Sequence, residues 1–254
     1  MKVAITGKGG AGKTTVAVML ARYLAAEGNK VILIDADPDG NTAMALGLDE
    51  SVEVKPIIEM KELILERTGA AGSGGQFFSL NPKVDDIPEE YAVEVDGVRL
   101  LRMGRLKKGG AGCMCPENAF VKSLLSHLLI GRDDFVILDM EAGIEHLGRG
   151  TAQGVDMMLA IVDPGRRSIQ TAFSVREFAA DIGIDNVGVM INKYRNEKEL
   201  ELIESQVSPL PVVGRIPYSD SIAASDLEGA CPYRNTQEQR RWIEQALSLI
   251  PARS

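Results

Sequence analysis

Short runs of consecutive apolar residues recur along the 254-residue chain and alternate with amphipathic stretches. Runs such as VILID, FVILD, MMLAIVD and VGVMIN are continuously apolar, which is typical of strands that are covered on both faces. This pattern predicts seven strands, at Lys2–Thr6, Lys30–Asp35, Val98–Met103, Phe135–Asp139, Asp156–Val162, Asn186–Ile191 and Val212–Ile216.

Amphipathic stretches between these runs predict five helices, at Lys13–Glu27, Glu117–Gly131, Ser168–Gly183, Glu197–Val207 and Thr236–Leu249. Strands that alternate with helices predict an α/β fold, a mostly parallel doubly wound sheet with helices on both faces. Residues 48–97 interrupt the alternation, and TGAAGSGGQ within them is typical of a loop. We interpret them as an irregular insertion in a single domain that spans residues 1–254.

Composition and charge narrow the class of partner. The net charge of −8 and the pI near 5.0 argue against nucleic-acid binding and against an anionic membrane surface. The N-terminus lacks the pattern of a signal peptide, and no apolar run approaches the roughly 20 residues that span a bilayer. We therefore expect a cytoplasmic protein with reduced cysteines.

A phosphate-binding loop follows the first predicted strand. The segment GKGGAGKT, Gly7–Thr14, fits G-x-x-x-x-G-K-[ST], in which glycines let backbone N–H groups surround phosphate oxygens at a helix N-terminus. Lys13 is expected to reach the β- and γ-phosphates, and the Thr14 hydroxyl to bind Mg²⁺. A second lysine, Lys8, could point outward toward phosphates held by another subunit.

Three further strand ends carry polar residues. VILIDADPDGN places Asp35, Asp37 and Asp39 after one strand, FVILD ends in Asp139, and VGVMIN ends in Asn192. The carboxyl ends of parallel strands meet at the ligand-binding edge, so the acidic residues can support Mg²⁺ or orient a water, and the amide can pair with a purine. The N-K-x-D guanine signature is missing, which favours adenine. The expected nucleotide contacts are Gly9, Gly10, Ala11, Gly12, Lys13, Thr14, Thr15, Asp139, Asn192 and Pro217.

These segments resemble the deviant Walker A motif and the two switch regions of the MinD/ParA/nitrogenase-iron-protein ATPases, with KGGAGKTT, DADPDGN and DMEAG as the matching sequences. The resemblance implies that Lys8 crosses a face-to-face homodimer to the partner's phosphates. It also implies that Asp37 positions the attacking water, which makes Lys8, Lys13 and Asp37 the expected catalytic residues. Asp39 matches the motif less clearly.

Within this class, the segments LLRMGRLKKGGAGCMCPENAF and EAGIEHLGRGT resemble the CooC-type nickel-insertion ATPases that mature carbon monoxide dehydrogenase. The resemblance implies Ni²⁺ or Zn²⁺ binding by Cys113 and Cys115 across a homodimer. It further implies ATP-driven delivery of nickel to an apo carbon monoxide dehydrogenase or, in some relatives, acetyl-CoA synthase. Nickel follows from the resemblance alone, because thiolates bind Zn²⁺ at least as readily.

The residues of the segment at about 107–117 by themselves predict half of a metal site, the C-x-C pair. Glycines before the two cysteines and Pro116 after them allow close approach of backbones, and a helix N-terminus favours thiolate. Two thiolates do not complete a tetrahedral site. Cys231 is typical of a late loop, His127 of a helix face, and His146 of the second switch. The simplest completion is the same pair of cysteines from a second copy.

Two other functions compete with ATP-driven metal delivery. A nitrogenase-iron-protein-like electron donor would hold a [4Fe–4S] cluster between subunits, although adjacent cysteines crowd such a cluster. A MinD/ParA-like positioning ATPase could dock on lipid through the C-terminal segment that contains Trp242, Ile243, Leu247 and Ile250. Because that segment lacks a lysine-rich polar face, we favour a terminal helix packed on the domain.

Overall fold

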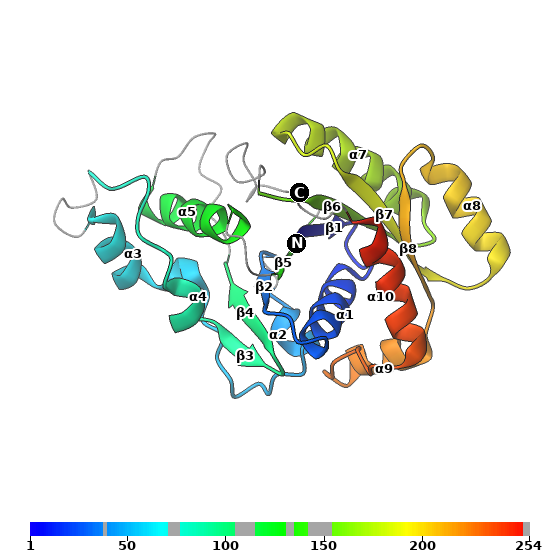
Figure 1. The fold of residues 1–254 in the computed structure, drawn as a ribbon, viewed down its shortest axis with the longest axis horizontal. Helices are drawn as coiled ribbons and strands as arrows, with labels where there is room; N and C mark the ends of the chain where they lie inside the picture. Colours follow the sequence, from blue (N-terminus) through cyan, green and yellow to red (C-terminus); the bar gives the residue numbers. More distant parts are fainter. Residues whose placement is uncertain (38–39, 71–76, 105–114, 131–134, 142–153, 251–254) are drawn as a thin grey trace.

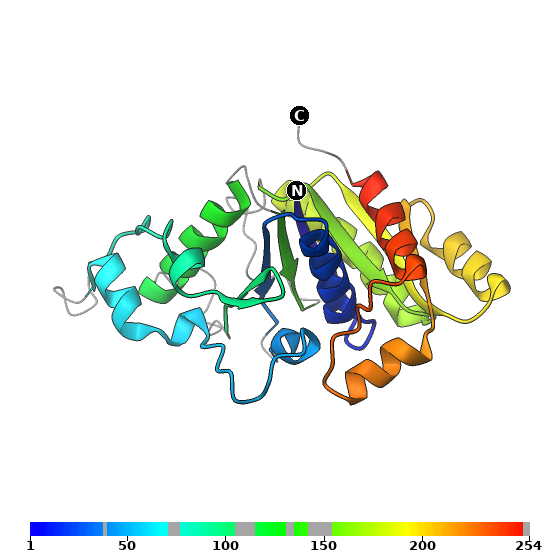
Figure 2. The same cartoon turned by 60° about the horizontal axis from the view of Figure 1, so that its bottom comes forward.

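A computed structural model describes residues 1–37, 40–70, 77–104, 115–130, 135–141 and 154–250 (Figures 1 and 2). All seven predicted strands are present and parallel: β1 (Lys2–Gly7), β2 (Val31–Asp35), β4 (Val98–Arg102), β5 (Phe135–Asp139), β6 (Met157–Val162), β7 (Val187–Tyr194) and β8 (Val212–Pro217). A short antiparallel strand, β3 (Val93–Val95), extends one edge, and the order is β3-β4-β2-β5-β1-β6-β7-β8.

All five predicted helices are present: α1 (Lys13–Ala26), α5 (Pro116–Ile130), α7 (Arg166–Ile182), α8 (Glu197–Val207) and α10 (Gln237–Leu249). The starts of α8 and α10 are fixed by side-chain caps, since Asn196 and Thr236 accept hydrogen bonds from the amides of Glu199 and Gln239. Helix α7 begins two residues earlier than predicted, directly after Gly165.

The two faces of the sheet are covered by different helices, as the continuous apolar strands predict. On one face, buried side chains of α5, α7 and α8, such as Phe120, Val175 and Ile203, pack on alternate strand residues. On the other face, α1 and α10 pack on the remaining strand residues (Figure 2). The chain therefore forms three layers with a core on each side of the sheet.

The C-terminal helix lies on the domain, as we favoured from its sequence. Ile243, Ala246 and Ile250 are buried, and Trp242 and Leu247 pack against the same core cluster. Among the described residues, no helix is both long enough and apolar enough to cross a membrane.

The insertion contains more regular structure than the sequence predicts. It includes a 3₁₀ turn (Ile57–Glu59), α3 (Lys61–Thr68), α4 (Ile87–Glu90) and β3, and the buried residues Ile57, Ile64 and Ile87 join the cluster beneath α5. Two further short helices, α2 (Thr42–Ala45) and α9 (Asp220–Leu227), were also not predicted. Most of the predicted TGAAGSGGQ loop lies outside the described residues.

Candidate nucleotide site and cysteine segment

The phosphate loop joins the end of β1 to the start of α1 at the carboxyl edge of the sheet. Gly10 and Gly12 have φ angles of 80° and 95°, which L side chains rarely adopt, and the Ala11 amide donates to the Lys8 carbonyl at 3.1 Å. Lys13 opens α1 and is buried, with 7% of its surface exposed. This backbone has the shape of a phosphate cradle at a helix N-terminus.

Strand β7 fixes the loop from one side. The Asn192 side-chain amide donates to the Ala11 carbonyl at 2.8 Å, and the Lys193 ammonium donates to the Gly10 carbonyl at 2.9 Å. A Cβ built on Gly12 would overlap the Asn192 amide nitrogen, so the loop and the strand are in direct contact. We conclude that Asn192 and Lys193 hold the cradle in place.

The predicted end of β7 was wrong. The strand continues past Ile191 to Tyr194 through an irregularity at Lys193, whose φ of 65° is left-handed. Pro217, the last residue of β8, lies opposite Tyr194 at the same edge and is half-buried. The purine contacts of Asn192 and Pro217 stay predictions.

Two buried carboxylates occupy the other side of the loop. Asp35 and Asp139 end β2 and β5 at positions in register with each other, and both are almost completely buried. Desolvation, strengthened by Asp139, raises the pKa of Asp35 to about 7. Desolvation also raises the pKa of Asp139 to about 6, although Thr14 and Lys13 oppose the shift. Burial therefore disfavours the ionised form of both carboxyl groups, and the Lys13 ammonium opposes this effect at Asp139.

These carboxylates fit a magnesium-bound nucleotide. Thr42 donates to one oxygen of Asp139 at 3.2 Å, and Thr14 bonds the same carboxylate, whereas Oδ1 of Asp139 and Oδ2 of Asp35 have no hydrogen-bond partner within the described part of the chain. Buried acceptors of this kind are the ligands that Mg²⁺ and its bound waters prefer. Thr14, predicted to bind Mg²⁺, thus lies beside Asp139, predicted to support it.

Asp37 follows Asp35, the last residue of β2, by two positions. Its amide donates to Oδ1 of Asp35 at 3.2 Å, and its carbonyl accepts from the Gly40 amide at 3.1 Å. Asp39 lies outside the described residues. The predicted water-positioning carboxylate therefore belongs to a residue bonded to the buried Asp35, and its charge acts on Asp139.

Lys8 reaches across its own chain. Its ammonium lies 3.5 Å from Oδ2 of Asp163, which follows β6, and 39% of the Lys8 side chain remains exposed. Because the pair is partly exposed, its strength is modest. The predicted contact between Lys8 and a partner subunit's phosphates stays a prediction.

Only one half of the C-x-C pair is described. Cys115 is half-buried directly before α5, and its carbonyl accepts the first hydrogen bond of that helix from the Ala119 amide at 3.1 Å. Cys113 and His146 lie outside the described residues, and no group of three or more metal-binding side chains occurs among the described ones. His127 is exposed on α5, as predicted for a helix histidine.

Cys231 lies apart from this segment. It is half-buried against Gly47, and desolvation raises the pKa of its thiol, which disfavours the thiolate that metal binding requires. This agrees with its assignment to a late loop.

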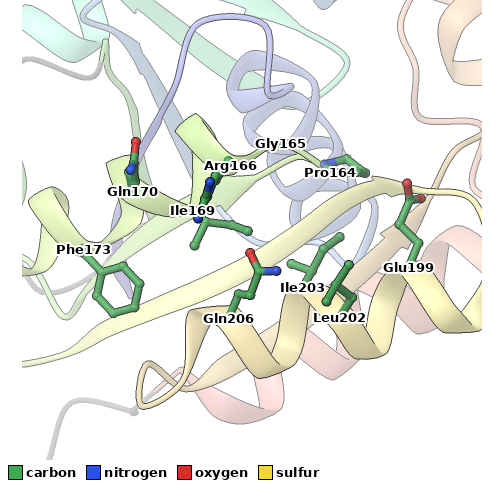
Figure 3. Close-up of a pocket in the computed structure, with 10 residues that line it drawn as sticks. All are labelled: Pro164, Gly165, Arg166, Ile169, Gln170, Phe173, Glu199, Leu202, Ile203 and Gln206. Atoms are coloured by element: carbon green, nitrogen blue, oxygen red, sulfur yellow. The ribbon is translucent and has the colours of Figure 1, made fainter.

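A separate groove of about 670 Å³ lies between α7 and α8. In Figure 3, Ile169 and Phe173 of α7 lie across from Leu202, Ile203 and Gln206 of α8. The predicted nucleotide contacts are not among its described lining residues. One lining residue, Pro164, directly follows Asp163, the partner of Lys8.

Four residues of the site were not predicted: Thr42, Arg102, Asp163 and Lys193. Each acts through a partner that is distant in sequence, such as Asp139 for Thr42 and Gly10 for Lys193. The one local signal was the position of Lys193 directly after Asn192 at a strand end.

Known proteins resemble this chain in sequence and in fold. The family model "CobQ/CobB/MinD/ParA nucleotide binding domain" matches residues 2–233. The chain is 45% identical over 235 residues to the carbon monoxide dehydrogenase accessory protein CooC of Rhodospirillum rubrum, covering 92% of this chain and 89% of that protein. It is also 45% identical to an uncharacterized ATP-binding protein of Methanocaldococcus jannaschii over 98% of this chain and 97% of that protein.

Solved structures of MinD proteins share the fold. The cell division protein MinD of Aquifex aeolicus has a TM-score of 0.67 at 22% identity and covers 100% of this chain and 99% of its own. MinD of Pyrococcus horikoshii, solved with Mg-ADP, has a TM-score of 0.65 at 19% identity and covers 99% of this chain and 98% of its own. At these identities the likeness shows the fold alone.

Proposed function

Because the chain belongs to the CobQ/CobB/MinD/ParA nucleotide-binding family and is an ATPase of that family, we propose that it is an ATP-dependent metallochaperone for carbon monoxide dehydrogenase or acetyl-CoA synthase. In this proposal it binds Ni²⁺ or Zn²⁺ as cargo and inserts nickel into the apo-enzyme. The observation that carries the proposal is the 45% identity to a carbon monoxide dehydrogenase accessory protein over 92% of the chain.

The phosphate loop is proposed to bind ATP and ADP through Gly9–Thr15. Lys13 neutralises phosphate charge, Thr14 holds Mg²⁺, and Asp139 accepts hydrogen bonds from the magnesium-bound waters. The unpartnered oxygen of Asp139 supports this assignment, because a buried carboxylate without a donor is costly unless a cation or water satisfies it. Asp37, on the adjacent turn, is proposed to position the attacking water.

The cargo site is proposed to form from Cys113 and Cys115 of two copies. The position of Cys115 at the start of α5 supports this, because thiolates are favoured where the helix dipole is positive. Complete structural zinc sites contribute about 10–16 kcal/mol of apparent binding free energy in peptides, so a shared site would link the two copies strongly. Lys8 in the same dimer is proposed to contact the partner's phosphates, which would let ATP change the cargo site.

The proposal is tested by metal analysis coupled to size-exclusion chromatography, with and without ADP and a slowly hydrolysed ATP analogue. The double variant Cys113→Ser, Cys115→Ser is compared with Cys231→Ser, a matched control that alters the remaining cysteine of the chain. We expect wild type and Cys231→Ser to bind one Zn²⁺ or Ni²⁺ per two chains and to dimerise with metal. The double variant is expected to bind no metal at this site and to dimerise when nucleotide is added but not when metal is added.

The proposal fails if the double variant still binds one metal per two chains with unchanged affinity. A brown colour after anaerobic purification that depends on Cys113 and Cys115 would instead support an iron–sulfur electron donor. Activation of nickel-free carbon monoxide dehydrogenase or acetyl-CoA synthase by the metal-loaded protein then identifies the client.

A further inference from the structure

Arg102 lies at the same edge of the sheet as the two buried carboxylates. It is the last residue of β4 and is in register with Asp35 of β2, which is in register with Asp139 of β5. Three neighbouring strands therefore end in a row of charged residues in which the arginine is outermost. Its side chain is half-buried.

The guanidinium of Arg102 packs directly against Gly40. A Cβ built on Gly40 would overlap the Nη2, Cζ and Nε atoms of Arg102, so a larger residue at this position would have to displace the guanidinium. Gly40 has a left-handed φ of 65°, and its amide donates to the Asp37 carbonyl. The arginine thus lies against the closing residue of the turn that carries Asp37.

The backbone around Arg102 is held on both sides. The Met103 amide donates to the Asp35 carbonyl at 2.8 Å, and the Met103 carbonyl accepts from the Ile58 amide at 3.2 Å. These bonds fix the end of β4 to β2 and to the insertion. The backbone that carries the Arg102 side chain is therefore held in place, so the guanidinium can act as a fixed support for Gly40.

The charge of Arg102 also acts on this corner of the site. It opposes the desolvation that raises the pKa of Asp35, and it faces both Asp35 and the Asp37–Gly40 turn. Its Nε has no hydrogen-bond partner within the described residues, and the guanidinium is in direct contact with Gly40.

We propose that Arg102 is a positioning residue for ATP hydrolysis, whose guanidinium packs against Gly40 and, through the hydrogen bond from the Gly40 amide to the Asp37 carbonyl, sets the position of the Asp37 carboxylate. The inference rests on the role proposed above for Asp37. Small displacements of a positioned group can lower a rate by up to about 100-fold. Loss of the support should therefore lower kcat rather than weaken nucleotide binding.

The test measures steady-state ATP hydrolysis by Arg102→Met, Arg102→Lys and Gly40→Ala. We expect kcat of Arg102→Met to fall about 10- to 100-fold while KM for ATP changes less than about twofold. Arg102→Lys should recover part of the loss because it keeps the charge. Gly40→Ala should reproduce the loss, because its methyl group displaces the guanidinium.

Matched controls separate this effect from general damage to the fold. Arg99→Met removes a second arginine of β4, and Gly69→Ala places a methyl group at a left-handed glycine (φ 72°) with no other atom within 4 Å of the new Cβ. Both are expected to keep kcat within about twofold of wild type. Circular dichroism and ADP binding verify that each variant is folded.

The inference is overturned if Arg102→Met keeps wild-type kcat, if KM rises while kcat is unchanged, or if Gly40→Ala loses no more than Gly69→Ala. The double variant Arg102→Met, Asp37→Asn should hydrolyse ATP no more slowly than Asp37→Asn alone, and an additive loss also overturns it. If Asp37→Asn itself keeps wild-type kcat, the proposed role of Asp37 fails. If only Arg102→Met is unimpaired, that role stands and the inference alone fails.

Discussion

The two sides of the phosphate loop differ in whether their buried polar groups have hydrogen-bond partners. On the β7 side, Asn192 and Lys193 donate hydrogen bonds to two successive loop carbonyls, so polar groups there are paired within the protein. On the β2 and β5 side, Asp35 and Asp139 are buried, and each has one oxygen without a partner in the described part of the chain. The first side is scaffold, and the second is arranged to receive a cation and its waters.

This difference distinguishes residues that stabilise the fold from residues that are kept for function. A paired hydrogen bond contributes about 1 kcal/mol to folding, whereas a buried, unpaired carboxylate destabilises the fold until a ligand satisfies it. We therefore expect changes on the β7 side to weaken the folded protein. Changes at the carboxylates are expected to strengthen the fold at neutral pH while removing function.

The largest effect is expected for Lys13, which lies between the two sides. Lys13→Met removes the buried ammonium that we propose binds the phosphates, and this ammonium also opposes the raised pKa of Asp139. Loss of a preorganised charge-stabilising group lowers rates by about 10²–10³-fold, and we expect ATP hydrolysis to fall by that factor. Lys198→Met, on the exposed surface of α8, serves as the control. Equal activity in both variants would contradict the assignment of Lys13.

The second effect is a pH dependence of stability that arises from Asp35. Its folded-state pKa, about 7, exceeds the ordinary value of 3.8, so the folded chain binds more protons than the unfolded chain between these values. The free energy of unfolding should therefore fall as pH rises from about 4.5 to 7.5, by roughly 2–4 kcal/mol for this group. Urea unfolding without nucleotide should show a shallower decline in Asp35→Asn.

Asp185→Asn changes an exposed carboxyl group and should retain the wild-type decline. If Asp35→Asn and Asp185→Asn show the same pH dependence, Asp35 is not the origin of the effect. The idea that the buried carboxylates of β2 and β5 destabilise the fold would then be wrong.

The smallest effect compares the two donors of β7. Asn192→Ala leaves the buried Ala11 carbonyl without its donor and should lower the free energy of unfolding by about 1–3 kcal/mol in the absence of nucleotide. Lys193→Ala removes an exposed donor and should cost less than about 1 kcal/mol. Urea unfolding at a single pH measures both. Equal costs would show that burial does not distinguish these bonds.

Much of the fold could be predicted from the sequence because its strands are continuous apolar runs and its main helices are long. The seven strands and five helices needed no knowledge of which strands are neighbours. The short helices, such as α2 and α9, escaped prediction because four to eight residues do not establish a helical period. The irregular end of β7 was missed because Lys193 there bonds a loop that is 183 positions away in the sequence, and such a contact leaves no local pattern.

The residues of the site also fall into those that local sequence predicts and those that it does not. The phosphate loop, Asp35 and Asp139 were predictable because each is identified by residues that are adjacent in the sequence. The contacts of Arg102 with Gly40 and of Thr42 with Asp139 join residues 62 and 97 positions apart, and they depend on the order of strands in the sheet. A single sequence does not specify that order.

The contact between Gly12 and Asn192 has a consequence for how sequences of this kind can change. The two positions are 180 residues apart, yet a methyl group on the first would occupy the place of the amide nitrogen on the second. A larger residue at position 12 would therefore have to displace the Asn192 side chain and, with it, the hydrogen bond to the Ala11 carbonyl. A side chain at position 12 would also have to adopt the left-handed φ of 95°, which a smaller residue at position 192 does not relieve. In descendants of this chain, position 12 should therefore stay glycine whatever residue occupies position 192.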